Sequence, residues 1–270
     1  MANTGQLLIV GCGNMGGAML AGWLRSGMSP DRFAILDPAL AQAPDGVALY
    51  REPAEADEAG SHDAVLLGFK PQQLGSLGPG LQAITGKTVA VHSLLAGLTL
   101  DHLRDAFPAA RAHIRVMPNL AARINRTPVI LLESGLAPDD RDPVLGFYDA
   151  LGAATWLEDE AKFDLVTALA GSGPGFVYRF IDALAEAASS LGLDRDQADK
   201  LALTMVDGAS SLVADAEISA GELADRVASP GGMTREGMNV LDADGALVRL
   251  LTQTLTATRD RGAELAAGTD

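Results

Sequence analysis

A glycine-rich segment near the start of the chain, between an apolar run and a helical pattern, constrains the fold most. Residues 11–16 read Gly-Cys-Gly-Asn-Met-Gly, directly after the apolar residues 7–10 and before the helical run of residues 18–25. In a strand–turn–helix unit the first glycine makes the tight turn, the second lets backbone approach a pyrophosphate, and the third lets the helix pack on the strand. The helix start then holds the phosphates. We therefore expect a dinucleotide to bind at Gly11, Gly13, Asn14, Met15 and Gly16.

Short β-type runs alternate with helical patterns up to residue 157, which is typical of a parallel sheet covered by helices. Strands are expected at residues 7–11, 33–37, 64–68, 88–92, 113–117 and 129–132, with a further one at 154–157. Beyond them the strand signal nearly disappears, and helices are expected at residues 160–170, 175–191, 194–216, 220–228, 234–241 and 245–266. We predict an α/β Rossmann domain with a doubly wound parallel sheet at residues 1–157, followed by an all-α domain at residues 158–270.

The expected helices of the second half are unusually apolar and rich in alanine over long stretches. Helices that bury only one side in so small a domain would leave apolar surface in water, and large exposed apolar patches usually mark interfaces. We therefore expect a homodimer formed through the helical domain. A self-contained helical bundle is the alternative.

The charge of the chain narrows the classes of partner. The formal net charge of the 270 residues is −15, whereas a nucleic-acid backbone or an anionic membrane requires a positive surface. The most apolar long segment, residues 175–191, carries Arg179, Asp182 and Glu186, so it is predicted to be a buried helix and not a bilayer span. Neither nucleic acid nor membrane is expected as a partner.

The cysteine and histidine residues of the chain argue against an internal disulfide, a metal site and a cysteine nucleophile. A single cysteine, Cys12, cannot form an internal disulfide, and residues 1–4 lack the basic region and apolar run of a secretory signal. We therefore expect a cytoplasmic protein. The four histidines have no metal-ligand spacing, so no metal is expected. Cys12 has no histidine near it in the sequence and is interpreted as a small apolar filler of the glycine turn.

Two charged residues follow expected strands at the carboxyl edge of the sheet, where cofactors bind in doubly wound folds. Asp37 ends the second expected strand, where its carboxylate would accept a hydrogen bond from the ribose 2′-hydroxyl of NADH and repel the 2′-phosphate of NADPH. The alternative is an ordinary Asp-Pro turn. Lys70 follows the third expected strand and could contact the cofactor or be an ordinary surface lysine.

A second glycine turn, Ser-Pro-Gly-Gly-Met-Thr at residues 229–234, runs directly into a helical pattern. Such a turn exposes several backbone N–H groups at a helix start, which favours binding of a small carboxylate. The alternative is a loop that merely connects two helices.

Taken together and in this order, five motifs resemble the pyrroline-5-carboxylate reductase family over nearly the whole chain. They are residues 11–16, Lys70-Pro71-Gln72, Met117-Pro118-Asn119, Gly171-Ser172-Gly173-Pro174 and residues 229–234. The resemblance implies reduction of L-1-pyrroline-5-carboxylate to L-proline by NADH or NADPH, the final step of proline synthesis. It also implies a homodimer interlocked through the helical domain, with larger assemblies of dimers common in the family.

The resemblance also assigns roles to single residues. Residues 11–16 and Asp37 would hold the dinucleotide, with Lys70, Pro71 and Asn119 along it beside the nicotinamide. The substrate carboxylate would bind at the second glycine turn, and Thr234 would donate toward the imine nitrogen. The residues implied on the substrate side are Gly231, Gly232, Met233, Thr234 and Glu217, the last of which could equally be an ordinary exposed helix residue.

Two departures from the family pattern bear on these roles. Leu120-Ala121 stands where the family usually has Thr-Pro after Asn119, so a hydroxyl contact from that position is in doubt. The family often uses NADPH and has small polar or basic residues after the second strand, so Asp37 favours NADH on the evidence of this sequence.

Two other functions compete with this interpretation. A reductase of the hydroxyacid-dehydrogenase type would need a lysine after a glycine motif on the first helix of the helical domain, and Lys162 lacks that arrangement. A noncatalytic dinucleotide-sensing dimer would not need the Pro-Gly-Gly-x-Thr turn that this chain carries.

Overall fold

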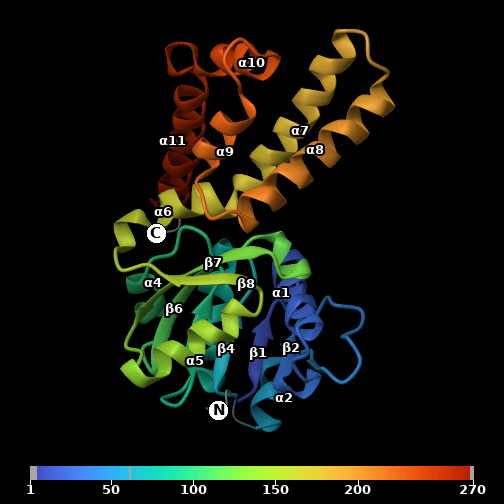
Figure 1. Ribbon diagram of the computed structural model, residues 1–270. Coiled ribbons are helices and arrows are strands. Elements are labelled where there is room, and N and C mark those ends of the chain that lie inside the picture. Colours follow the sequence, from blue (N-terminus) through green and yellow to red (C-terminus); the bar gives the residue numbers. More distant parts are fainter. Residues whose placement is uncertain (1–4, 61, 268–270) are drawn as a thin grey trace. The chain divides into compact units, whose positions relative to one another are not determined.

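An eight-stranded sheet organises the first half of the chain in the computed structural model, which describes residues 5–60 and 62–267 (Figure 1). The strand order is β3-β2-β1-β4-β5-β6-β7-β8, and its first six strands follow the order of doubly wound dinucleotide-binding folds. Every pair is parallel except β6–β7. The strands are β1 (Leu7–Val10), β2 (Phe33–Leu36), β3 (Ala48–Tyr50), β4 (Ala64–Leu67), β5 (Ala90–Ser93), β6 (Ala112–Met117), β7 (Thr127–Ser134) and β8 (Gly152–Trp156).

The sequence predicts seven of these strands within a few residues, but it misses β3. This three-residue strand pairs with β2 at the edge of the sheet, and all three of its residues are half-buried. So short a strand has no alternation of buried and exposed positions that a sequence pattern could reveal.

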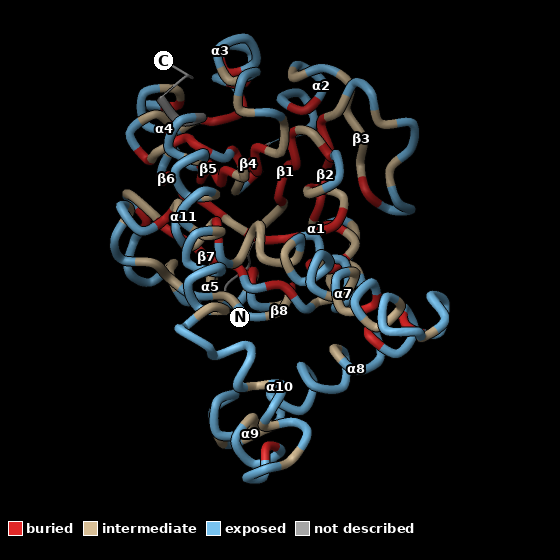
Figure 2. The backbone as a smooth tube through the Cα atoms, turned by 90° about the horizontal axis from the view of Figure 1, so that it is seen from above, coloured by how far each residue is buried: buried red, intermediate tan, exposed pale blue. Residues whose placement is uncertain are grey.

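Both faces of the sheet are buried (Figure 2), and strands β1, β2 and β4 are apolar at every position. One face packs Ile9 and Ile35 against Trp23 of α1 (Asn14–Arg25) and Tyr148 of α5 (Pro138–Asp149). The other face packs against α2 (Pro53–Glu58) and α4 (Leu100–Ala106). The remaining short elements here are α3 (Leu74–Leu77), η1 (Pro30–Arg32), η2 (Pro71–Gln73), η3 (Gly78–Ile84) and η4 (Leu120–Ile124).

The single helix expected at residues 160–170 is instead three short pieces: η5 (Glu160–Lys162), α6 (Phe163–Val166) and a π-turn, η6 (Thr167–Gly171). Phe163 packs with residues of α4 and β7. The Asn119 side chain donates to the carbonyl oxygen of Ala170 at 2.9 Å. These contacts tie residues 160–171 to the sheet. The first compact unit accordingly runs to Gly171 and resumes at Thr258, whereas the sequence pattern suggests a boundary near residue 157.

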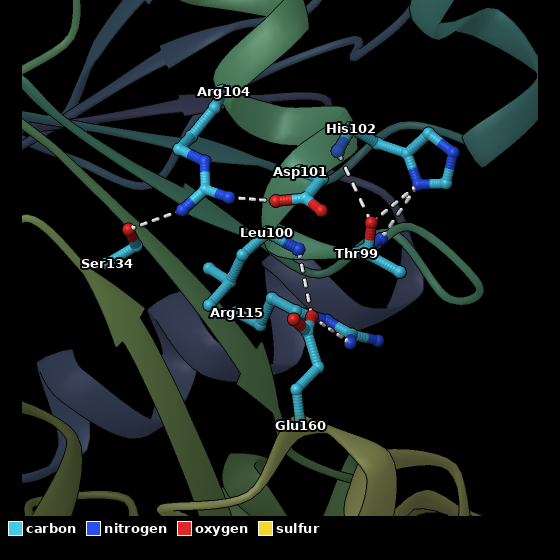
Figure 3. A network of polar contacts seen from close by, with 8 residues as sticks. All are labelled: Thr99, Leu100, Asp101, His102, Arg104, Arg115, Ser134 and Glu160. Carbon is cyan, nitrogen blue, oxygen red and sulfur yellow. Dashed lines mark hydrogen bonds and ion pairs between the residues drawn. The ribbon is translucent and has the colours of Figure 1, made fainter.

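An ion pair with a buried arginine strengthens this attachment (Figure 3). The Arg115 side chain on β6, only 5% exposed, donates to Glu160 Oε1 at 2.8 Å and stacks 3.7 Å above the Phe163 ring. The same carboxylate oxygen accepts the backbone N–H of Leu100, at the start of α4, at 2.9 Å. One carboxylate therefore joins a strand, a helix start and the segment that follows the sheet.

The second compact unit, Ser172–Ala257, contains the expected helices. Its helices α7 (Gly173–Ser190) and α8 (Arg195–Asp215) form a hairpin that packs through small residues, among them Ala185, Ala198 and Ala202. The other elements are α9 (Ala220–Val227), α10 (Met233–Asp242), η7 (Ala243–Gly245) and α11 (Ala246–Ala267), the last of which ends in the first unit. A Rossmann-type α/β domain followed by an all-helical region confirms the predicted fold class.

Much apolar surface of the helical unit is exposed, and α8, α9 and α10 are largely exposed in Figure 2. The exposed side chains include Val177, Tyr178, Phe180, Leu201, Leu203, Met205, Leu212, Val213, Val240, Val248, Leu250 and Leu251. Within the described residues, no helix combines the length and the apolar character needed to cross a membrane.

Candidate functional site

The glycine turn between β1 and α1 has the geometry that its sequence predicts. Gly11 has a φ of +85°, and a Cβ on it would lie 2.9 Å from the backbone nitrogen of Phe69. A Cβ on Gly16 would lie 2.9 Å from the carbonyl oxygen of Gly11, which explains why α1 can pack so closely on β1. A Cβ on Gly13 would meet nothing within 4 Å. Gly13 is also the N-cap of α1 and has no side-chain cap, so the helix start is open to a ligand.

A cleft of about 670 Å³ lies where β1, β2 and β4 end. The strand ends, the glycine turn and the segments that follow β2, β3 and β4 line it. Gly68 is needed here, because a Cβ on it would lie only 2.4 Å from the carbonyl oxygen of Gly11. The lining includes Val10, Gly11, Gly13, Asn14, Leu36, Asp37, Arg51, Gly68, Phe69, Lys70, Gln73 and Leu81.

Asp37 lines the cleft with its carboxylate held by backbone amides. Oδ2 accepts the N–H of Cys12 at 2.9 Å, and Oδ1 accepts the N–H groups of Ala39 and Leu40 at 2.9 and 3.1 Å. A carboxylate held by three amides is fixed in direction and keeps about one lone-pair site, on Oδ2, for a further donor. Asp37 is therefore more than the first residue of an Asp-Pro turn, because its side chain connects the loop after β2 to the glycine turn.

Cys12 lies within the turn as a buried protonated thiol. Burial, followed by the charge of Asp37, raises its pKa to about 11. A thiol with so high a pKa forms no thiolate near neutral pH, which agrees with the prediction that Cys12 is a filler and not a nucleophile.

Arg51 and Gly68 are cleft residues for which sequence reasoning assigned no role. Arg51 follows β3, the strand that the sequence does not reveal, and only the β2–β3 pairing brings it beside Asp37. Gly68 follows β4, and a glycine directly after an apolar strand is a signal that could have identified it.

The predicted cofactor residues fall into two groups in the structure. Gly11, Gly13, Asn14, Asp37 and Lys70 line the cleft. The remaining four do not appear in its lining: Met15, Gly16, Pro71 and Asn119.

The physical reasons differ for each of these four. Met15 packs against the core beneath the turn, and Gly16 is buried against β1. Pro71 begins η2 and borders a neighbouring hollow. Asn119 is 5% exposed, and its side-chain amide is bonded at both ends, accepting from Ala121 N and donating to the carbonyl oxygen of Ala170.

The second glycine turn forms the start of α10 in the helical unit. Gly231 has a φ of +73°, and the Gly232 N–H donates to the Ser229 carbonyl oxygen at 2.9 Å. Gly232 is the N-cap of α10 and has no side-chain cap, so the amides of the first helical turn lack a side-chain acceptor. The Arg235 guanidinium supports the turn by donating to the Ala228 carbonyl oxygen and to Asp225.

The remaining substrate-side residues are accessible. Met233 is 94% exposed, and Thr234 lies next to it on the first turn of α10 and is also exposed. Glu217 is exposed in the turn between α8 and α9, outside any helix, and no hydrogen bond or ion pair joins it to residues 229–234 in the described part of the chain. Among the described residues, no group of three or more His, Cys, Asp or Glu side chains could hold a metal ion.

Lys162, on which the hydroxyacid-dehydrogenase alternative depends, lies in η5. Its ammonium is 3.5 Å from an Asp159 carboxylate oxygen, and both side chains are at least half exposed. This ion pair is on the surface and lies outside the cleft lining, so its geometry gives no support to that alternative.

Comparison with known proteins identifies the family. Residues 160–265 match the family model described as pyrroline-5-carboxylate reductase dimerisation. Pyrroline-5-carboxylate reductase 2 of Bacillus subtilis is 32% identical over 267 residues, which cover 95% of this chain and 93% of that protein. The Escherichia coli pyrroline-5-carboxylate reductase is also 32% identical, over 90% of this chain and 93% of its own length.

Solved structures agree with the sequence comparisons. A pyrroline-5-carboxylate reductase from Coxiella burnetii superposes with a TM-score of 0.89 at 29% identity, covering 98% of this chain and 99% of that one. The Plasmodium falciparum enzyme with NADP bound has the same fold, with a TM-score of 0.82 at 21% identity over 97% and 98% of the two chains. The cleft, the two glycine turns and the near full-length identities together show that this chain belongs to the pyrroline-5-carboxylate reductase family.

Proposed function

We propose that this chain reduces L-1-pyrroline-5-carboxylate to L-proline with a nicotinamide dinucleotide, in the final step of proline biosynthesis. The observation that carries the proposal is identity of 30% or more to curated reductases over nearly the full length of both chains. The residues present fit the cofactor, because Gly13 faces open space at an uncapped helix start and Asp37 lies at the end of β2. When bound, the dihydronicotinamide would supply the hydride.

On the substrate side, the proposed role of residues 231–234 is to bind the carboxylate. The uncapped amides at the start of α10 carry the positive end of the helix dipole, which favours an anion there. A substrate anchored by its carboxylate presents its small ring in a defined orientation, which is the main contribution a protein makes to hydride transfer. Met233 and Thr234 would border the ring, and Glu217, in the connection between α8 and α9, is proposed on the family resemblance alone.

The imine nitrogen gains a proton during the reaction. The nearest charged neighbour along the turn, Arg235, is committed to Asp225 and to the Ala228 carbonyl oxygen. We infer that the imine binds already protonated or is protonated through Thr234 and water, so that the Thr234 hydroxyl orients the ring and does not itself ionise.

For the cofactor, we propose a preference for NADH. The Asp37 carboxylate lines the cleft in an orientation held by three amides. An acid at the end of the second strand accepts a hydrogen bond from the ribose 2′-hydroxyl and repels a 2′-phosphate. Lys70 would contribute to the cleft wall, whereas Pro71, Asn119, Met15 and Gly16 would support the site from outside its lining.

For the assembly, we propose a homodimer through the helical unit, consistent with the dimerisation model that its residues match and with its exposed apolar side chains. A larger assembly of dimers and a cytoplasmic setting, both expected from the sequence, are part of the same proposal.

Steady-state kinetics test this function. Initial rates with pyrroline-5-carboxylate should show oxidation of both cofactors, with the higher kcat/KM for NADH. Absence of turnover with either cofactor would contradict the function and favour a dinucleotide sensor, and a higher kcat/KM for NADPH would contradict the role of Asp37 alone.

Thr234 provides a sharper test of the substrate side. Thr234→Ala should lower kcat/KM for the imine by more than about tenfold while NADH affinity is unchanged, because only a substrate contact is removed. Thr234→Ser, which keeps the hydroxyl, should recover most of the loss. Near-normal turnover of Thr234→Ala would rule out this role.

A further inference from the structure

Arg51 holds the loop after β2 through that loop's backbone carbonyls. Its Nη1 donates to the carbonyl oxygen of Asp37 at 2.8 Å and to that of Leu40 at 2.5 Å, and its Nη2 donates to that of Ala41 at 3.5 Å. The guanidinium is planar, so its donors reach these acceptors as a fixed fork. Arg51 also lines the cleft. It lies outside the glycine turn of residues 11–16, so the phosphate-binding role of that turn does not account for it.

The same loop is held from its other side by the Asp37 carboxylate, which accepts the N–H groups of Ala39 and Leu40. The carbonyl groups of Asp37, Leu40 and Ala41 therefore face Arg51, while two amide groups of the same loop face the Asp37 carboxylate. The Asp37 N–H is in turn bonded to the Tyr50 carbonyl oxygen at 3.1 Å, which places the root of the loop against the end of β3. The position of the carboxylate in the cleft thus depends on a short chain of contacts that passes through Arg51.

Arg51 is also a cation beside the place where a 2′-phosphate would lie, and an arginine there can accommodate the phosphate in NADPH-dependent enzymes. Here three of its five N–H donors, including both on Nη1, are directed to carbonyl oxygens. Turning toward a phosphate would leave these carbonyls without their donor, at the cost that attends broken hydrogen bonds to a charged group. The observed geometry therefore commits Arg51 to the loop.

We propose that Arg51 is a positioning residue for the cofactor preference: it holds the loop of residues 37–41 so that Asp37 presents its carboxylate to the ribose, and it is not a phosphate ligand. This inference rests on the proposed function and deepens it, because it makes selectivity for NADH a property of two residues that are 14 positions apart.

The test is a double-mutant cycle on the full-length enzyme with Arg51→Ala, Asp37→Asn and the double variant. Arg51→Ala should raise the KM for NADH by roughly tenfold, as expected when a hydrogen bond to a charged group is weakened, and should leave kcat and the KM for NADPH within about twofold. Because Arg51 acts through Asp37, the double variant should bind NADH no more weakly than Asp37→Asn alone. Arg51→Lys should recover only part of the loss, since one ammonium cannot reproduce the fork.

Independent readouts separate this inference from the proposed function. In the enzyme without dinucleotide, amide hydrogen exchange of Ala39 and Leu40 should be faster in Arg51→Ala than in the unmodified protein. Equilibrium titration with NADH should reproduce the cycle without any turnover. Arg25→Ala, an exposed arginine at the far end of α1, is the control and should change neither measurement.

Three outcomes would overturn the inference. The KM for NADPH could rise in Arg51→Ala, or the effects of the two single variants on the KM for NADH could multiply in the double variant. The third outcome is amide hydrogen exchange of Ala39 and Leu40 that is unchanged in Arg51→Ala. Loss of imine reduction by the unmodified enzyme would instead overturn the proposed function, and the exchange and titration results would still decide the role of Arg51.

Discussion

Glycines around the nucleotide turn differ in what a methyl group would meet. A Cβ on Gly13 would project into open space, whereas one on Gly68 would lie 2.4 Å from the backbone oxygen of Gly11. Gly68 is thus required by the packing of the turn itself, whereas packing does not require Gly13, and its proposed role is to let the cofactor approach the backbone.

We expect Gly13→Ala to leave the free energy of unfolding unchanged within about 1 kcal/mol, because the backbone there is extended (φ −73°, ψ −152°) and a Cβ would meet nothing within 4 Å. The same variant should weaken NADH binding by at least about tenfold through obstruction of the pyrophosphate. Gly68→Ala should destabilise the protein by about 1–3 kcal/mol through overpacking. Urea unfolding and NADH titration measure the two effects. Gly17→Ala, whose Cβ would meet only Cys12 O at 3.7 Å, is the control. Normal NADH affinity in Gly13→Ala would refute the assignment.

A buried histidine at the residue scale makes stability depend on pH. His92 is 4% exposed, its Nδ1 lies 2.6 Å from the Tyr148 hydroxyl, and burial, followed by the charge of Arg111, lowers its pKa to about 3. Burial likewise raises the pKa of Tyr148, so the hydroxyl is the donor and the imidazole nitrogen the acceptor. The native protein therefore keeps His92 neutral under conditions where the unfolded chain protonates it.

As the pH falls below the ordinary histidine value of 6.5, the unfolded state should take up a proton that the native state does not. The contribution of His92 to stability should thus fall by up to about 1.4 kcal/mol per pH unit until the native pKa is approached. Urea unfolding between pH 7 and pH 5 should show a shallower pH dependence for His92→Gln than for the unmodified protein. Equal slopes would mean that His92 takes up its proton over the same pH range in the native and the unfolded states.

At the scale of elements, two short segments make contacts that connect parts of the first unit. β3 brings Arg51 to Asp37, and residues 160–171 are held on the sheet by Asn119, Phe163 and the Arg115–Glu160 pair. Loss of the Glu160 carboxylate would leave a guanidinium buried without its partner.

We expect Glu160→Ala to lower the free energy of unfolding of the first unit by about 2–4 kcal/mol, somewhat less than for a fully buried ion pair, because the Glu160 side chain is 35% exposed. The double variant Arg115→Met, Glu160→Ala should be more stable than Glu160→Ala, since no unpaired charge remains. The neighbouring exposed pair Arg104–Asp101, also drawn in Figure 3, is the matched control, and Asp101→Asn should cost less than about 1 kcal/mol. Chemical denaturation measures all three, and equal effects of Glu160→Ala and Asp101→Asn would contradict the role of burial.

The sequence predicts the long elements because their patterns are local. Strands β1, β2 and β4 are continuous apolar runs, and the glycines of the first turn have a defined spacing. Arg51 could not be found in this way, because its role depends on the pairing of a three-residue strand. Asn119 differs again, since family resemblance assigns it to the cofactor while its side chain is bonded to Ala121 and Ala170.

At the scale of the whole molecule, the helical unit leaves large apolar side chains in water, among them Leu203 and Leu212 of α8, which are 58% and 60% exposed. Such a surface is typical of an interface between copies of a chain. The apolar composition of the helices in the second half therefore predicts an interface between copies of the chain, but it does not predict which faces of these helices are covered.

We expect Leu203→Arg together with Leu212→Arg to shift the protein from dimer toward monomer, because two charges would be buried in an apolar contact. Sedimentation velocity at micromolar concentration measures the change. Gln197→Arg on the same helix adds one charge at an exposed polar position and should leave the dimer intact. Dimers that persist in the double variant would exclude this part of α8 from the interface.

Helix α11 starts in the second unit and, from Thr258 onward, belongs to the first. There Gly262 lies beside Asp164, because a Cβ on this glycine would lie 3.8 Å from the carboxyl carbon of Asp164. The helical unit, Ser172–Ala257, is thus inserted between two segments of the first unit. Recombination between relatives at a single crossover near residue 171 would replace the part of α11 from Thr258 onward, which belongs to the first unit. Exchange of residues 172–257 with two crossovers would keep that part of α11 together with the rest of its unit.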